Sequence, residues 1–309
     1  MADYLAITGG VGGAKLALGL AHVLPADKVA FAVNTGDDFE HLGFAISPDI
    51  DTLTYTLSDL ANRELGWGRH DETWAFMEAL EQLGGETWFR LGDRDLALHA
   101  FRTAALKAGR TLTEVTAEIG QRLGIDQAIL PMSDDPVRTT VLTSDGPLAF
   151  QHYFVRDRCA PAVSGFEFRG VESARLNPEI EALLPGLKGV IICPSNPFVS
   201  VDPLLSIGDT RAKLAALDVP VVAVSPIVGG IAIKGPTAKM MAELMIPATA
   251  AAVANHYDGL IDGFVLDSED ADLVGTLNVP SVATQSVMLT LDDRISLAQA
   301  TLEFLNELR

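Results

Sequence analysis

The stretch Tyr4-Leu5-Ala6-Ile7-Thr8-Gly9-Gly10-Val11-Gly12-Gly13-Ala14-Lys15 decides the fold class of this chain. Its first five residues are a short apolar run, which is typical of a buried strand. Four glycines in five positions follow, and residues 15–24 then show the apolar spacing of a helix. A second β-like run covers residues 29–34. Strand, glycine loop, helix and strand in this order predict the start of a parallel, doubly wound sheet.

The pattern becomes helical between residue 51 and about residue 124. Asp71 and Asp93 are suitable N-caps in this region, and Gly84 and Gly109 are suitable helix stops. Four successive helices without an intervening strand predict a helical insertion at about 52–125, beside the sheet. The expected helices are 52–65, 71–83, 93–107 and 111–123.

A turn of sequence Ser144-Asp145-Gly146-Pro147 separates two β-like runs, 138–143 and 148–155. This arrangement predicts a β-hairpin, within a region of about 137–170. Strands and helices then alternate again to the end of the chain. We therefore expect a single Rossmann-like α/β domain over 1–309, with a doubly wound, mostly parallel sheet, an α-helical insertion and a small antiparallel hairpin. The remaining expected strands are 189–193, 219–224, 263–266 and 281–283, and the remaining helices are 209–217, 236–245 and 292–308.

The composition indicates a cytoplasmic protein with a sizeable core. Of the 309 residues, 48% are apolar, but no apolar run is long enough for a transmembrane helix. The N-terminus lacks the basic and apolar segments of a secretory signal. The two cysteines, Cys159 and Cys193, do not indicate a disulfide framework.

The net charge of −19 argues against binding to nucleic acids or anionic membranes. It also repels a nucleotide. Any phosphate site must therefore be built locally, from backbone N–H groups, a few cations and a divalent metal ion.

The glycine loop is the expected phosphate site. Glycines permit positive φ and close approach of the backbone, and a helix N-terminus presents free N–H groups to an anion. The spacing matches neither the P-loop nor the G-x-G-x-x-G pattern, and an ordinary tight turn is the alternative. The dense glycines favour phosphate binding. The residues expected to bind here are Gly9, Gly10, Val11, Gly12, Gly13 and Lys15.

Two acidic segments follow the second strand, Asn34-Thr35-Gly36-Asp37-Asp38 and Ser47-Pro48-Asp49-Ile50-Asp51. Strand ends in an open parallel sheet face the ligand crevice. Carboxylates near a phosphate loop are natural ligands of Mg²⁺, which would offset their repulsion of the phosphates. The alternatives are helix capping for the second segment and a loop turn for the first. We expect the metal ligands to be Asp37, Asp38, Asp49 and Asp51, with Asn34 and Thr35 lining the ligand site.

Weaker signals lie in three later segments. Ser195 and Asn196 follow one expected strand and Ser225 follows another, where polar loops are common. Arg90 lies in Trp88-Phe89-Arg90-Leu91-Gly92-Asp93-Arg94-Asp95 and could clamp an aromatic ring or a phosphate. The alternative for that segment is a cluster of interhelical salt bridges. The histidines show no metal-ligand spacing.

Taken together, these motifs resemble the 2-phospho-L-lactate transferase family (CofD/FbiA type), which acts in biosynthesis of the deazaflavin coenzyme F-420. The matching pieces occur in the family's order and span nearly the whole chain. They are Thr8-Gly9-Gly10-Val11-Gly12-Gly13-Ala14-Lys15, Asn34-Thr35-Gly36-Asp37-Asp38, Ser47-Pro48-Asp49-Ile50-Asp51-Thr52, Trp88-Phe89-Arg90-Leu91-Gly92-Asp93, Ser133-Asp134, Pro194-Ser195-Asn196-Pro197 and Ser225-Pro226-Ile227.

The resemblance implies transfer of a phospho-three-carbon-acid group from a guanosine-diphospho donor to the ribityl hydroxyl of the deazaflavin Fo, with release of GMP. The acid is 2-phospho-L-lactate, phosphoenolpyruvate or phosphoglycerate. The glycine loop and Mg²⁺ would hold the diphosphate, and Asp49 or Asp51 would position the acceptor or metal or accept the hydroxyl proton. Arg90 would help to hold Fo. Ser195, Asn196 and Ser225 would line the nucleotide, and the family suggests a homodimer.

Val11 departs from the family pattern, because many members have threonine or a similar small residue at this place in the loop. A hydroxyl is lost, but the backbone donors remain.

Two other functions compete with this interpretation. A non-catalytic nucleotide-sugar or dinucleotide-binding regulator of the YvcK type is similar around the glycine loop, but is typically rich in glycine and serine after the Asp-Asp turn. Here that segment reads Phe39-Glu40-His41-Leu42-Gly43. An NAD-dependent oxidoreductase would use Asp37 for the ribose, but the glycine spacing does not fit.

Overall fold

The computed structural model describes residues 2–62, 66–233 and 235–309. Its centre is a seven-stranded sheet of order β14-β13-β10-β9-β1-β2-β5, in which all neighbouring strands are parallel. The order corresponds to the doubly wound arrangement, so the predicted fold class is confirmed. The strands are β1 (Tyr4–Thr8), β2 (Val29–Val33), β5 (Ala128–Pro131), β9 (Gly189–Ile192), β10 (Val221–Val224), β13 (Gly263–Asp267) and β14 (Ser281–Thr284).

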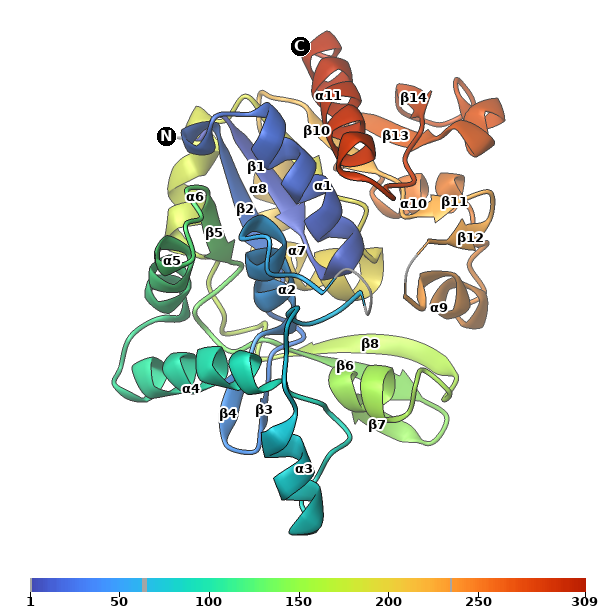
Figure 1. Cartoon of the computed structure of the whole chain (residues 1–309). Helices are drawn as coiled ribbons and strands as arrows, with labels where there is room; N and C mark the ends of the chain where they lie inside the picture. Colours follow the sequence, from blue (N-terminus) through green and yellow to red (C-terminus); the bar gives the residue numbers. More distant parts are fainter. Residues whose placement is uncertain (1, 63–65, 234) are drawn as a thin grey trace.

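Both faces of this sheet are covered, which explains why its strands are apolar without alternation. Along β1, Leu5 and Ile7 enter one core cluster and Tyr4 and Ala6 enter the other. The second cluster is closed by α1 (Gly10–Val23), α2 (Pro48–Leu57) and α11 (Leu291–Glu307), which lie together on one side of the sheet in Figure 1. The opposite face carries α6 (Pro178–Leu183), α7 (Asp202–Leu205), α8 (Thr210–Ala215), α9 (Thr237–Glu243) and α10 (Ala250–His256).

A second group of elements lies beyond one end of the sheet, at the bottom of Figure 1. A backbone hydrogen bond of 2.7 Å from Thr139 N–H to the Gly36 carbonyl joins it to the loop that follows β2. It therefore lies at the carboxyl ends of the strands, where α/β proteins bind ligands. Its elements are the hairpin β3 (Phe39–His41) and β4 (Phe44–Ile46), the helices α3 (Ala75–Gln82) and α4 (Asp93–Lys107), and the antiparallel sheet of β6 (Arg138–Thr143), β7 (Gly146–Ala149) and β8 (Val163–Arg169).

The helices expected at 52–65 and 71–83 differ from the structure at their ends. The first begins earlier, at Pro48, and ends at Leu57, while residues 63–65 lie outside the described residues. The second begins only at Ala75, so the prediction of Asp71 as its N-cap is wrong. The helix expected at 15–24 begins within the glycine loop, at Gly10.

Asp93 has a different role from the one predicted. Gly92 is the N-cap of α4, and Asp93 is the first helical residue. The Asp93 carboxylate instead accepts the N–H groups of Ala75 and Phe76, so it caps α3 through space. Gly84 and Gly109 follow helices with φ of 77° and 89°, as expected of helix stops.

The second run of the predicted hairpin ends at Ala149, and a π-helical turn, His152–Arg156, replaces its remainder. The strands β3, β4, β5 and β8 were not predicted, because β3 and β4 have three residues each, β5 has four, and the seven residues of β8 mix polar and apolar types. Of the helices in 52–125, α5 (Leu112–Arg122) packs against β5 and α2 against α1, so both belong to the layers of the sheet.

The remaining elements are short. They are the two-residue strands β11 (Ile227–Val228) and β12 (Ile231–Ala232) and the single-turn or irregular helical segments Ala26–Lys28, Leu184–Gly186, Pro197–Val201 and Ser268–Leu273. Within the described residues we find no helix with the length and apolarity needed to span a bilayer.

Candidate active site

The site is built around the point where the sheet order changes direction. The chain leaves β1 toward β2 on one side, and β9 lies on the other side of β1. The loops after β1 and β9 therefore meet at the topological switch point, where this fold binds ligands. The N–H of Gly9 donates to the Ser195 hydroxyl at 3.1 Å, which ties the two loops together.

The glycine loop lies too close to its neighbours for side chains. A Cβ on Gly12 would come within 2.5 Å of the Pro194 carbonyl oxygen, and one on Gly13 within 2.3 Å of the Thr8 hydroxyl. Gly10 has a φ of 65°, in the left-handed region. The N-cap residue of α1, Gly9, has no side chain and no acid lies in the first turn, so the N–H groups that follow Gly10 suit an anion.

Asp49 reaches the glycine loop from the first turn of α2. Its carboxylate accepts the Gly10 N–H at 2.8 Å and the Asn34 amide at 2.9 Å. Asn34 is itself fixed, because its carbonyl accepts the Gly36 N–H and its amide also donates to the Val199 carbonyl. Burial raises the pKa of Asp49 to about 6 against these two hydrogen bonds.

Asp37 lies beside Asp49 and is buried. One of its carboxylate oxygens, Oδ1, has no hydrogen-bond partner. Burial, followed by the charge of Asp49, raises the pKa of Asp37 well above its ordinary value. Two buried carboxyls that oppose each other's ionisation need either a shared proton or a cation.

Asp38 faces a different set of groups. The Ser47 hydroxyl donates to its Oδ2 at 2.8 Å, while its Oδ1 is buried without a partner. Burial raises the pKa of Asp38 to about 7, and the positive charges of Arg138 and Arg102 act in the opposite direction.

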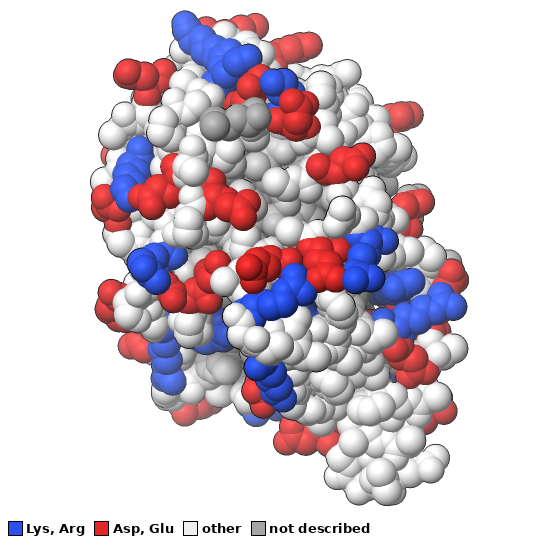
Figure 2. All heavy atoms as spheres, turned by 90° about the vertical axis from the view of Figure 1, so that its left-hand side faces the viewer, with Lys and Arg blue, Asp and Glu red and all other residues white. Residues whose placement is uncertain are grey.

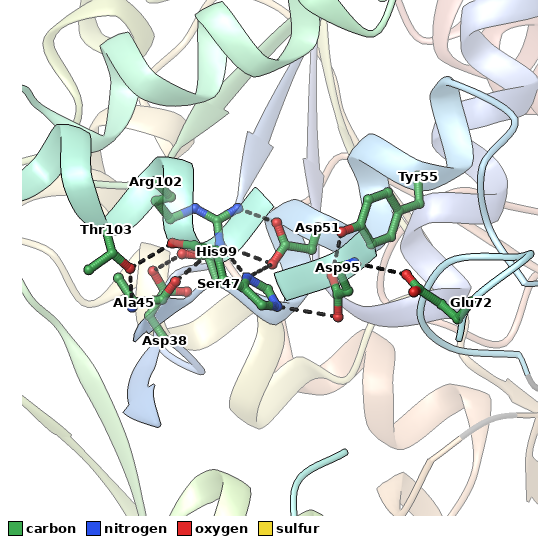
Figure 3. A network of polar contacts seen from close by, with 10 residues as sticks. All are labelled: Asp38, Ala45, Ser47, Asp51, Tyr55, Glu72, Asp95, His99, Arg102 and Thr103. Carbon is green, nitrogen blue, oxygen red and sulfur yellow. Dashed lines mark hydrogen bonds and ion pairs between the residues drawn. The ribbon is translucent and has the colours of Figure 1, made fainter. Parts of the chain in front are cut away.

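Asp51 is held by Arg102, a fully buried arginine of α4, which donates to both of its carboxylate oxygens. His99 lies between Asp51 and Asp95 in the same network (Figure 3). Within the described part of the chain, no three His, Cys, Asp or Glu side chains form a preformed metal-binding group. The four aspartates expected to converge on one metal ion therefore do not form a single cluster, since Asp51 pairs with Arg102 while Asp49 bonds to Gly10 and Asn34.

The network around Asp51 extends along α4 and was not predicted. The Tyr55 hydroxyl donates to Asp95, and the Glu72 carboxylate accepts the Asp95 N–H at 2.8 Å. The signal in the sequence was the helical spacing of Asp95, His99 and Arg102 on one face of α4, a polar face that a surface helix would turn outward. In the structure this face is buried against α2 and the β3–β4 hairpin (Figure 3).

Several predicted residues bond to structural neighbours. The Lys15 ammonium donates to the Met288 carbonyl at 2.7 Å. The side-chain carbonyl of Asn196 accepts the Phe198 N–H, and the Ser225 hydroxyl is hydrogen-bonded to Ile227 within its own turn. Arg90 stacks on the Trp74 ring, with its guanidinium carbon 4.4 Å from the ring centroid. The Thr35 hydroxyl is buried and has no partner.

An aromatic cluster lies next to the acidic residues in the chain. Trp88 contacts Phe39, His41 and His152 with ring centroids 4.9–6.0 Å apart, and Phe89 packs edge-on to Phe39. These rings come from β3, from the segment before α4 and from the π-helical turn. Because Phe39 directly follows Asp38 in the chain, the cluster places flat apolar surface next to this aspartate.

The buried carboxyls predict a pH-dependent stability for the metal-free protein. Folding raises the pKa values of Asp37, Asp38 and Asp49, so the native state binds more protons than the unfolded state and stability falls as pH rises through about 4 to 7. We expect the urea midpoint to decrease from pH 5 to pH 8 without divalent cations. Added Mg²⁺ should restore more stability at pH 8 than at pH 5, and an equal effect at both pH values would contradict the metal assignment.

Comparisons with known proteins identify the family. The family model described as 2-phospho-L-lactate transferase CofD matches residues 5–301. A phosphoenolpyruvate transferase of Streptomyces griseus is 38% identical over 312 residues, covering 98% of each chain. A 2-phospho-L-lactate transferase of Methanosarcina mazei is 38% identical over 263 residues, covering 85% of this chain and 86% of the relative.

A solved structure shares the fold at much lower identity. It is a UPF0052-family protein from Bacillus halodurans, with a TM-score of 0.64 and 13% identity over 98% of this chain and 99% of that one. At this identity the likeness concerns the fold alone. The family match over nearly the whole sequence and the transferases at 38% identity show that this chain belongs to the 2-phospho-L-lactate transferase CofD family.

Proposed function

We propose that this protein transfers a phospho-three-carbon-acid group from a guanosine-diphospho donor to the ribityl hydroxyl of Fo, releasing GMP, as an Mg²⁺-dependent cytoplasmic enzyme of coenzyme F-420 biosynthesis. The observation that carries the proposal is Asp49, whose carboxylate is held between the Gly10 N–H and the Asn34 amide at the mouth of the glycine loop. The names of the relatives support a transferase, and the fold alone would not separate it from a regulator or an oxidoreductase.

The donor diphosphate is proposed to lie on the N-terminus of α1. The N–H groups of Val11 and Gly12 open that helix, and the open space beside Gly10 leaves room for close approach of phosphate oxygens. Ser195, which already accepts the Gly9 N–H, lines the nucleotide side together with Asn196. Because the protein is acidic, these local donors and a cation must supply the attraction for phosphate.

The carboxylates fit a divalent cation. Asp37 and Asp38 each present a buried, unpartnered oxygen, and hard carboxylate oxygens are the ligands that Mg²⁺ prefers. Asp37 and Asp49 would hold the ion with Asp38 beside them, and Asp51 supports them through its pair with Arg102. When bound, Mg²⁺ would neutralise charge on the diphosphate and on the departing GMP.

The reaction needs a base for the acceptor hydroxyl. The ribityl oxygen attacks the phosphorus that carries the three-carbon acid, the bond from that phosphorus to the oxygen bridging to GMP breaks, and the hydroxyl proton passes to a carboxylate. Asp49 is the better candidate than Asp51, because the positive charge of Arg102 neutralises Asp51, whereas burial raises the pKa of Asp49 to about 6. The Trp88 cluster and Arg90 would hold the deazaflavin ring, since flat aromatic surface and a guanidinium suit such a ring.

The first experiment is a fluorescence titration with Fo, with and without GDP and Mg²⁺. We expect saturable Fo binding that becomes tighter when GDP and Mg²⁺ are both present, because they complete the donor side of the site. Turnover is then measured with each of the three donors by release of GMP. A protein that ignores Fo but binds a nucleotide sugar or NAD would instead be a regulator or an oxidoreductase.

A further inference from the structure

A cleft of about 870 Å³ opens beside Asp38 on the side of the molecule that carries α5 and α6. Its inner end is formed by Thr35, Asp38, Ser47 and Arg138. Its walls come from the connection between α4 and α5, from the loop between β5 and β6, and from residues 174–178 and 207–213. The cleft therefore begins at Asp38, next to the proposed metal ligand Asp37, and runs to the surface, and the function proposed above uses no other part of it.

Of the described cations that line this cleft, the three besides Arg138 each lie within ion-pair distance of a carboxylate. Arg110 pairs with Glu118, Arg175 lies 3.8 Å from Asp135, and Lys213 lies 3.0 Å from Asp209. Figure 2 views this side of the molecule and shows Lys and Arg next to Asp and Glu rather than in separate patches. The outer part of the cleft thus has no strong preference for an anion or a cation.

Arg138, the remaining cation of the cleft, differs from these residues. Its Nη1 donates to the carbonyls of Val137 at 2.7 Å and Thr35 at 3.5 Å, which fixes the side chain at the inner end. Among the residues that the structure describes, no carboxylate lies within ion-pair distance of it, and neither Nε nor Nη2 has a hydrogen-bond partner. One edge of the guanidinium is therefore available to a ligand that carries two oxygens.

Two buried hydroxyls next to Arg138 also lack partners. The Thr35 and Thr139 side chains are 2% and 3% exposed, and the structure gives neither hydroxyl a hydrogen bond. Thr35 lines the cleft, whereas Thr139 follows Arg138 on β6, where successive side chains alternate in direction, and is not part of the cleft lining. Buried hydroxyls are normally satisfied, so the unpartnered hydroxyl of Thr35 points to a polar ligand at this end of the cleft.

We propose that Arg138, with the Thr35 hydroxyl, binds the carboxylate of the three-carbon acid carried by the donor, and that the cleft determines donor specificity. The inference rests on the proposed function, which places the diphosphate at the glycine loop and the metal at Asp37 and Asp49. The acid is attached to the distal phosphate and would extend past Asp38 into the cleft. In this arrangement Mg²⁺ would offset the negative charge of Asp38, so the positive charge of Arg138 would remain available to the ligand.

The carboxylate is the group that the three candidate acids share and that GDP lacks. An Arg–carboxylate pair with two parallel hydrogen bonds is strong and directional. Arg138 would thus separate a loaded donor from GDP, whose guanosine and diphosphate are otherwise alike. The outer part of the cleft, with its apolar and mutually paired residues, would then distinguish one acid from another.

The test is a calorimetric titration of Arg138→Gln with GDP and with the guanosine-diphospho derivatives of phospholactate, phosphoenolpyruvate and phosphoglycerate. We expect the donor that wild type prefers to bind about 10- to 100-fold more weakly, because a charged hydrogen-bonded pair is lost. GDP affinity should stay within about twofold of wild type. Arg138→Lys should recover part of the donor affinity, because it keeps the charge but not the planar fork.

The matched control is Arg122→Gln, which removes the same charge from an exposed position on α5 where Arg122 pairs with Glu118 outside the cleft. It should change neither affinity. Equal losses for GDP and donor in Arg138→Gln, or unchanged donor binding, would overturn the role of Arg138 and leave the proposed function in place. A wild-type protein that binds none of the three donors would overturn both.

Discussion

Asp49→Asn should slow transfer to Fo by about 10²- to 10⁴-fold, the range expected when a positioned general base is lost. The asparagine keeps an oxygen that can accept the Gly10 N–H, but it loses the charge for Mg²⁺ and the basic oxygen for the hydroxyl proton. Its NH₂ group would also face the Asn34 amide, which now donates to the carboxylate at 2.9 Å. GMP release with the preferred donor at saturating Mg²⁺ measures the effect.

The control is Asp145→Asn, the same change at an exposed position in the turn between β6 and β7, which should leave turnover unchanged. The melting temperature of Asp49→Asn should stay close to that of wild type, because the lost Asn34 hydrogen bond is offset by removal of an ionised carboxyl that is costly to bury, as its pKa of about 6 indicates. Turnover of Asp49→Asn within threefold of wild type would remove Asp49 from the base and metal roles together.

Arg102→Met should destabilise the protein by about 3–5 kcal/mol, because it leaves the buried Asp51 carboxylate without its cation. Methionine fills much of the volume of the arginine stem, so the loss reports the charge rather than a cavity. The free energy of unfolding by urea measures it. The substitution should also weaken Mg²⁺ binding. Arg102 donates to Asp51 and to the Ala45 carbonyl, and so fixes the segment that contains Ser47. The Ser47 hydroxyl in turn holds Asp38 beside the proposed metal site.

The double variant Arg102→Met with Asp51→Asn separates these effects. Removing both charges should recover much of the stability, because a neutral asparagine costs far less to bury than an unpaired carboxylate. If the double variant regains stability but still transfers the group to Fo more slowly than wild type, the Arg102–Asp51 pair positions the residues of the active site. If the free energy of unfolding of Arg102→Met alone lies within about 1 kcal/mol of the wild-type value, water or another group compensates the charge of Asp51. The Arg102–Asp51 pair would then have no structural importance.

The sequence was most informative where a local pattern has one physical meaning. The apolar run before the glycine loop predicted β1, and the helix at 93–107 was predicted with its observed bounds. The strand β5 was missed, because its pairing partner β2 is distant in sequence, and β3 was missed because three residues are too few to show a period. Asp71 was predicted to cap α3, but Asp93, eighteen residues beyond Ala75, reaches its N–H groups through the fold.

The sequence by itself determined that an α/β sheet presents glycines, an amide and carboxylates at its strand ends, because strand direction and helix N-termini follow from local order. It also determined the family, through an ordered set of motifs. Only the tertiary structure decided which carboxylate does what. Asp49 and Asp51 lie two residues apart in α2, yet one turns to the glycine loop and the other to Arg102. Electrostatic roles depend on burial and on partners distant in sequence, and neither is encoded in local spacing.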